Sequence, residues 1–267
     1  MTAPLQYFIV DAFTDRPFAG NPAAVVPLSA WRPDGWLQSV AMEMNLSETA
    51  FVVRRDGGGF DLRWFTPKVE VDLCGHATLA SAVALSQLGH LPDGAEIKFS
   101  TRSGVLSAGR RGDRYQLDFP LKPESPAAAP PGLVEALGVA PRYVGKNQFD
   151  YLVEAESEDA VRRAAPDFKR LAQTECRGII VTARSATPEF DFVSRFFAPA
   201  AGIDEDPVTG SAHCCLADFW GRRLGKTALV GYQASARGGV VQVELRGQRV
   251  LLAGQGVLVA RGELLVD

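Results

Sequence analysis

The order of apolar and polar residues predicts short β-strands in the first half of the chain. Five segments are rich in β-branched and aromatic residues and partly alternate between apolar and polar positions, which is typical of half-buried strands. Gly57, Gly58 and Gly59 separate the second segment from the third and predict a hairpin turn. The predicted strands are 7–13, 49–54, 60–65, 96–100 and 115–119.

Three other segments are predicted to be helices. Residues 35–44 form an amphipathic pattern, whereas 75–89 is almost wholly apolar or small as far as Leu85 and ends at Gly89. A helix that is apolar on every side is buried, and a glycine commonly ends a helix. The segment 210–221 is again rich in small residues. We therefore expect two curved, mostly antiparallel sheets, each wrapped around one central helix.

The two halves of the chain resemble each other. Five residues of the first half recur 132 positions later, and seven more recur 135 positions later. Twelve matches at two related offsets favour a duplication with a small insertion in a loop over chance. The residues with the offset of 132 are Phe60, Arg63, Phe65, Pro67 and Asp72, and those with the offset of 135 are Gly75, Arg102, Gly104, Val105, Gly112, Arg114 and Leu117.

A proline-rich segment divides these halves. Residues 120–132 contain five prolines in thirteen positions, which excludes a central strand or a helix interior. The sequence thus predicts a first domain over 1–122, a linker over 123–132 and a second domain over 133–267. The C-terminal strand of the second could pack on the first. Half of the 267 residues is an ordinary domain size.

Composition excludes several classes of protein. The net charge of −3 and the pI near 5.7 give no basic excess for nucleic acid. No apolar run is long enough to span a membrane, and the first residues lack the charged start of a secretory signal. Four cysteines in a chain of this length do not form a disulfide framework. We expect a cytoplasmic protein with free thiols that binds neither nucleic acid nor membrane.

The two buried helices start with the strongest chemical signals. One start is the run DLCGHAT at 72–78 and the other is DEDPVTGSAH at 204–213. Amide groups at a helix N-terminus bind anions, so the two starts could hold a substrate carboxylate and stabilise an enolate-like intermediate. The alternative is ordinary N-capping by Asp72, Thr209 or Ser211.

Ser47, Glu48 and Thr49 form a polar interruption between the first helix and the second strand. A partly desolvated carboxylate there could act as a general base, although a solvated loop glutamate is the simpler interpretation. Histidines and cysteines also stand at both helix starts, but their spacing matches no metal motif, so no metal site is expected. These residues are Cys74, His76, His213, Cys214 and Cys215.

Motifs along nearly the whole chain resemble those of the PhzF-like family, named for an isomerase of phenazine biosynthesis. The matching runs are DAFTDRPFAGNPAAVV from Asp11, NLSETAFV from Asn45, DLCGHATLA from Asp72, GIDEDPVTGSAH from Gly202 and QASARGG from Gln233. The resemblance implies an α+β fold of the diaminopimelate epimerase type with two pseudo-symmetric domains. It also implies an enzyme without a cofactor that forms a homodimer.

The resemblance further assigns roles to individual residues. Glu48, His76 and Asp206 match the family's catalytic positions, and four further residues match positions that contact the substrate. These four are Ser47, Gly75, Gly210 and Ser211.

The sequence thus favours a cofactor-independent isomerase that moves a proton on a small carboxylated metabolite, with Glu48 as the general acid and base. A non-catalytic carboxylate-binding protein on the same fold is one alternative. A racemase with two opposed thiols is another. Cys74 stands where the first thiol of such a site would be, whereas Cys214 and Cys215 lie inside their predicted helix.

Overall fold

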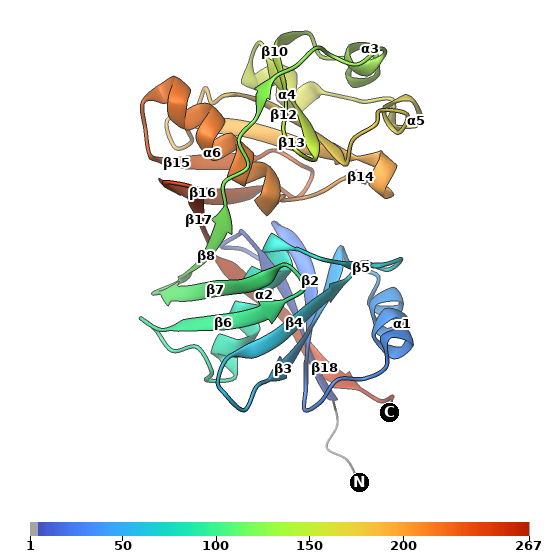
Figure 1. Cartoon of the computed structure of the whole chain (residues 1–267), viewed down its shortest axis with the longest axis vertical. Coiled ribbons are helices and arrows are strands. Elements are labelled where there is room, and N and C mark those ends of the chain that lie inside the picture. The colour runs from blue at the N-terminus through green and yellow to red at the C-terminus, as the bar shows by residue number, and fades with distance from the viewer. Residues whose placement is uncertain (1–4, 267) are drawn as a thin grey trace. The chain divides into compact units, whose positions relative to one another are not determined.

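The computed structural model describes residues 5–266 and divides the chain into two compact units (Figure 1). Unit 1 comprises Met1–Asp118 and Ala253–Asp267, and unit 2 comprises Phe119–Leu252. The C-terminal strand β18 (Gly256–Leu264) belongs to unit 1, where it pairs antiparallel with β1 (Leu5–Ala12). Within the described residues, no helix is both long and apolar enough to cross a membrane.

Unit 1 is built on one mixed, mostly antiparallel sheet. Its strands pair in the order β18, β1, β2, β3, β4, β6, β7 and β8, and only the pairs β2–β3 and β4–β6 are parallel. The short β5 pairs with β4. The remaining bounds are β2 (Asn21–Leu28), β3 (Glu48–Arg54), β4 (Phe60–Phe65), β5 (Glu70–Val71), β6 (Glu96–Thr101), β7 (Gly104–Arg111) and β8 (Arg114–Pro120).

The helix α2 (Gly75–Gln87) lies at the centre of unit 1. It contacts β1, β2, β3, β7 and β18, and every residue from His76 to Leu85 is buried. Alanine and serine dominate this stretch, and such small side chains let strands approach the helix on all sides. The outer helix α1 (Asp34–Met44) instead buries one face, through Leu37, Val40 and Ala41. Both helices match their predicted positions.

Unit 2 repeats this arrangement. Its strands pair in the order β9, β10, β11, β12, β13, β15 and β16, with β11–β12 and β13–β15 parallel. The short β14 pairs with β13, as β5 pairs with β4 in unit 1. The strand bounds are β9 (Ser125–Pro126), β10 (Pro141–Lys146), β11 (Asp150–Ala155), β12 (Gly178–Arg184), β13 (Phe192–Ala198), β14 (Ile203–Glu205), β15 (Ala228–Gln233), β16 (Gly239–Arg246) and β17 (Arg249–Gly254).

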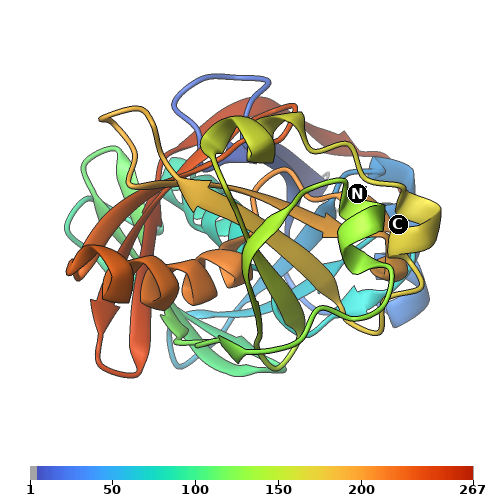
Figure 2. The same cartoon turned by 90° about the horizontal axis from the view of Figure 1, so that it is seen from above.

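The helix α6 (Gly210–Leu224) is the counterpart of α2. It lies against β15 and β16 (Figure 2), and Trp220 reaches Thr182 on β12 with an indole hydrogen bond of 3.0 Å. Two sheets of the same connectivity, each around a buried helix, agree with the predicted α+β fold. The other helices of unit 2 are α3 (Leu133–Leu137), α4 (Glu158–Arg163), α5 (Phe168–Leu171) and the 3-10 turn η1 (Pro199–Ala201).

An ion pair also recurs in the two units. Arg63 on β4 binds Glu70 through two bonds of 2.7 Å, and Arg195 on β13 binds Glu205 through bonds of 2.7 and 2.8 Å. Each guanidinium lies over the phenylalanine two residues further along its strand. Arg63 and Arg195 are separated by the offset of 132 found in the sequence. The repeated residues therefore hold equivalent strand ends together.

Two features differ from what the prolines predict, which is no central strand at a proline and a linker at the proline-rich segment. β2 lies between β1 and β3 although it contains Pro22 and Pro27, and the sequence analysis predicts no strand there. The proline-rich segment is also part of unit 2: Ser125–Pro126 pairs with β10, and the buried Glu124 accepts hydrogen bonds from Tyr143 and Arg222.

Candidate active site

The starts of three elements meet at one edge of the sheet in unit 1. β2 and β3 are parallel, with Ala23 opposite Glu48, so both strands begin at this edge. The central helix α2, which contacts both strands, begins at Gly75. This topology brings together Asn21, Glu48 and His76, which are far apart in sequence.

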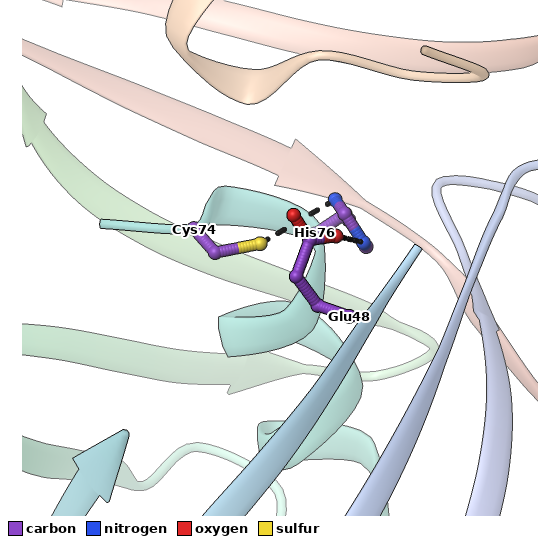
Figure 3. Close-up of side chains that lie close together, drawn as sticks. All are labelled: Glu48, Cys74 and His76. Atoms are coloured by element: carbon purple, nitrogen blue, oxygen red, sulfur yellow. Dashed lines mark hydrogen bonds and ion pairs between the residues drawn. The ribbon is translucent and has the colours of Figure 1, made fainter. Parts of the chain in front are cut away.

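Glu48 and His76 form the centre of this cluster (Figure 3). A carboxylate oxygen of Glu48 lies 2.9 Å from Nε2 of His76, and the two side chains are only 12% and 5% exposed. The other ring nitrogen, Nδ1, lies 3.1 Å from the amide nitrogen of Asn21 and 3.6 Å from Sγ of Cys74. The imidazole is thus held between a carboxylate on one side and an amide and a thiol on the other.

Burial and charge act in opposite directions on this cluster. Burial alone would lower the pKa of His76, but the neighbouring Cys74 and Glu48 raise that pKa well above 6.5. Burial and the charge of Glu48 also raise the pKa of the Cys74 thiol. The close contacts of the three side chains therefore act against burial at His76 and together with burial at Cys74.

The start of α2 has free capacity to bind an anion. Its N-cap residue is Cys74, which makes no side-chain capping bond, and the alternative cap Asp72 lies exposed in the preceding loop. Amides of the first helical turn have no partner inside the helix. Gly75 is the first helical residue, and Ser47 lies half-buried directly before β3.

A second polar cluster surrounds the start of α6 in unit 2. The N-cap Thr209 donates its hydroxyl to Asp206 over 2.6 Å instead of capping the helix. The buried Gln233 side chain accepts a hydrogen bond of 2.9 Å from the Thr209 amide and donates one of 2.7 Å to the Asp206 carbonyl. Gln233 therefore fixes the backbone that carries Asp206, which lies shortly before α6 begins.

A positive charge lies beside this helix start. Arg177 donates to Oγ of Ser211 at 3.0 Å and to Asp150 at 2.8 Å, with a second, shorter contact to the same carboxylate. Its guanidinium also packs over the rings of Phe149 and Phe196. The α6 amides beyond Gly210 favour a negatively charged group, whereas the charge of Arg177 is already balanced by Asp150.

The other histidine and cysteines of α6 are buried in its interior. His213 donates from Nδ1 to the Thr209 carbonyl at 2.8 Å, and burial lowers its pKa to about 4. Burial raises the pKa of Cys214 and of Cys215 to about 12. At neutral pH both are uncharged thiols, so they pack rather than react.

The structure thus groups the predicted residues in two places. Ser47, Glu48, Gly75 and His76 gather at one edge of unit 1, and Asp206, Gly210 and Ser211 gather at the start of α6 in unit 2. Residue reasoning gave no role to three further residues that contact or position these groups. They are Asn21, Arg177 and Gln233, of which Asn21 had a local signal, because a Gly-Asn-Pro run interrupts an apolar segment. Cys74, which the sequence offered as the first thiol of a racemase, contacts His76.

Known proteins resemble this chain over its whole length. The family model of phenazine biosynthesis-like proteins, PhzC-PhzF, matches residues 10–262. An uncharacterized isomerase of Halalkalibacterium halodurans is 52% identical over 267 residues, which cover 100% of both chains. The crystal structure of a PhzF-family phenazine biosynthesis protein from Enterococcus faecalis superimposes with a TM-score of 0.94 at 41% identity, over 99% of this chain and 100% of that one.

A more distant structure has the same fold. A hydroxyproline epimerase from Agrobacterium vitis covers 100% of this chain and 94% of its own, with a TM-score of 0.65 and 12% identity. Its similarity is therefore one of architecture, and it agrees with the epimerase-type fold expected from the sequence. The family match and the 52% identity lead to a direct statement: the chain belongs to the PhzC-PhzF family of phenazine biosynthesis-like proteins.

Proposed function

We propose that this protein is a cofactor-independent isomerase that moves a proton on a small carboxylated metabolite, with Glu48 as the general acid and base. Relatives named as isomerases support the reaction class. The observation that carries the mechanism is the buried contact of 2.9 Å between Glu48 and His76 beside the uncapped start of α2.

In this mechanism Glu48 removes a proton from a carbon next to an activating carboxyl or carbonyl group. It then returns the proton to a different carbon of the same substrate, so that the protein ends each cycle unchanged. His76 balances the charge of Glu48 and holds its carboxylate in place. The amides after Gly75 stabilise negative charge that develops on the substrate, as helix N-termini do.

Unit 2 offers groups suited to substrate binding. Gly210 and Ser211 begin α6, and the nearby Arg177, which is paired with Asp150, donates a hydrogen bond to Ser211. We assign to them the binding of a substrate carboxylate. Asp206, whose backbone is fixed by Gln233, is assigned the binding of a polar substituent or the relay of a proton.

The thiols do not favour a two-cysteine racemase. Such a mechanism needs one thiol to act as a base, and a base needs a lowered pKa. Burial and Glu48 instead raise the pKa of Cys74, and burial raises the pKa of Cys214 and Cys215 to about 12. Glu48 is the better-suited base.

Solvent exchange tests this function even though the substrate has not been identified. The full-length protein is incubated in D₂O with a panel of small carboxylates, and each compound is analysed by mass spectrometry and NMR. We expect at least one compound to gain carbon-bound deuterium together with a shifted double bond or stereocentre. A compound that binds tightly but never exchanges would identify a binding protein and contradict the proposal.

A further inference from the structure

Three donor atoms of different chemistry converge beside α2. A carboxylate oxygen of Glu48, Sγ of Cys74 and a ring nitrogen of His76 all lie within 4.8 Å of one another (Figure 3). Cys74 and His76 are buried and Glu48 is nearly so. Thiolate, imidazole and carboxylate are the three ligand types found in zinc sites.

The distance between the sulfur and the ring nitrogen fits a tetrahedral ion. A sulfur and a nitrogen bound to one zinc ion at tetrahedral angles lie about 3.5 Å apart, given bonds of about 2.3 and 2.0 Å. Sγ of Cys74 lies 3.6 Å from Nδ1 of His76. The Glu48 oxygen lies within 4.8 Å of the other two donor atoms, so its carboxylate has to shift toward the ion to complete the site, and the Asn21 amide has to turn away from Nδ1.

Unsatisfied polar atoms also point to a ligand. Oε2 of Glu48 and Nε2 of His76 are buried, and although they are 2.9 Å apart neither has a hydrogen bond of good geometry. Buried polar atoms without such a bond are uncommon and call for an explanation. An ion bound by Glu48 would give its carboxylate a direct partner, whereas Nε2 of His76 would lie on the far side of the ring from the ion.

Charge balance also favours the binding of a divalent cation to these three side chains. A divalent cation with one carboxylate, one thiolate and one neutral imidazole has no net charge, so its burial carries a small penalty. Cys74 releases its thiol proton to solvent as the sulfur–metal bond forms, and a protonated His76 releases its ring proton in the same way. No redox partner takes part.

From this geometry we propose that a thiophilic divalent cation such as Zn²⁺ binds Glu48, Cys74 and His76 and blocks the site. The ion is an inhibitor, because it occupies the carboxylate that the proposed reaction needs. The sequence predicts no metal site, because the spacing of its histidines and cysteines matches no metal motif. Only the fold brings the three donors together.

Cobalt provides the direct probe, because a cobalt–thiolate bond produces a charge-transfer absorption. The metal-free, full-length protein is titrated with Co²⁺, and Zn²⁺ is then added as a competitor. We expect one Co²⁺ per chain, a thiolate charge-transfer band, and loss of that band as Zn²⁺ displaces cobalt. Absence of a band, or a band that Zn²⁺ does not remove, overturns the proposal.

Matched cysteine variants locate the site. Removal of a group in the outer shell of a metal site costs about 10–100-fold in affinity, so loss of a direct ligand in Cys74→Ser should cost more than about 100-fold. Cys176→Ser is the control, because Cys176 is the more accessible thiol of unit 2. A band that survives in Cys74→Ser or disappears in Cys176→Ser places the ion elsewhere and refutes the assignment.

Two measurements keep the test decisive if Cys74→Ser folds poorly. His76→Asn and Glu48→Gln should each weaken Co²⁺ binding, and Zn²⁺ should raise the melting temperature of the wild-type protein but not of His76→Asn. Unchanged affinity in both variants contradicts the site. The blocking step alone rests on the proposed function: saturating Zn²⁺ should abolish deuterium exchange, and continued exchange with the ion bound would refute that step only.

Discussion

The buried His213 makes stability depend on pH in a way that can be calculated. His213 lies inside α6 with its ring fully covered, and burial holds its pKa at about 4, against 6.5 for an ordinary histidine. In the unfolded chain the ring takes up a proton as the pH falls below about 6.5, whereas the folded protein resists protonation until about pH 4. Acid therefore favours the unfolded state.

The size of the effect follows from the same two values. A tenfold change in proton affinity corresponds to about 1.36 kcal/mol, so a pKa lowered from 6.5 to about 4 costs about 3 kcal/mol. Above pH 6.5 the ring is neutral in both states and the folded protein keeps its full stability. As the pH falls from 6.5 to about 4, the folded protein loses about 3 kcal/mol of that stability. For a protein domain this is a large part of the total free energy of unfolding.

Urea unfolding followed by circular dichroism at several pH values measures this contribution. His213→Asn is the informative variant, because its amide can still donate to the Thr209 carbonyl and takes up no proton. Between pH 7 and pH 4 the wild type should lose about 3 kcal/mol more stability than His213→Asn. His90→Asn, which removes an exposed histidine, is the control and should keep the wild-type dependence. An equal loss in the wild type and His213→Asn would refute the reasoning.

Two substitutions test the packing around α2 and β2, each by urea unfolding. Gly20→Ala should destabilise by more than about 1 kcal/mol, because Gly20 has φ +63 and a Cβ there would lie 2.1 Å from the Ala12 carbonyl oxygen. Gly35→Ala is the control and should not destabilise the protein, because a Cβ there meets nothing within 4 Å. Equal losses of stability in the two variants would contradict the account. Leu85→Ala should cost about 2–5 kcal/mol because its side chain is fully buried. Leu88→Ala should cost far less, because the Leu88 side chain is partly exposed. A small loss of stability in Leu85→Ala would argue against a buried, central α2.

The sequence predicts the central helices well because their composition admits few alternatives. The stretch from His76 to Leu85 contains no Asp, Glu, Lys or Arg, so a helix formed by it is expected to be buried. The repeat of Arg63 at Arg195 likewise reflects a physical need, since each arginine binds a glutamate on the neighbouring short strand. Patterns tied to burial or to a repeated contact can be read without a structure.

Strand β2 shows why other parts could not be predicted. Pro22 and Pro27 argue against a strand with neighbours on both sides, yet β2 pairs with β1 and β3. The long-range pairing of its apolar residues outweighs the local preference of two prolines. Local rules carry no information about such pairing, so the strand that positions Asn21 was missed.

The candidate site lies between these cases. From the residues alone a solvated loop side chain is the simpler interpretation of Glu48, and only the resemblance to the family assigned it a catalytic role. Its contact with His76 depends on β2 and β3 being parallel and on α2 starting at their common edge. That convergence also explains why Cys74 and Asn21 contact the same imidazole. Sequence spacing shows none of these contacts.

The central claim is that the carboxylate of Glu48 transfers the proton. Its most direct test is the rate of deuterium incorporation from D₂O into a substrate found in the carboxylate panel, measured for the wild type and Glu48→Gln. Glu43→Gln, an exposed glutamate of α1, is the matched control. Glu48→Gln should stay folded and lose about 10²–10⁴-fold in rate, while Glu43→Gln keeps the wild-type rate. A folded Glu48→Gln protein that exchanges deuterium at the wild-type rate would contradict the account.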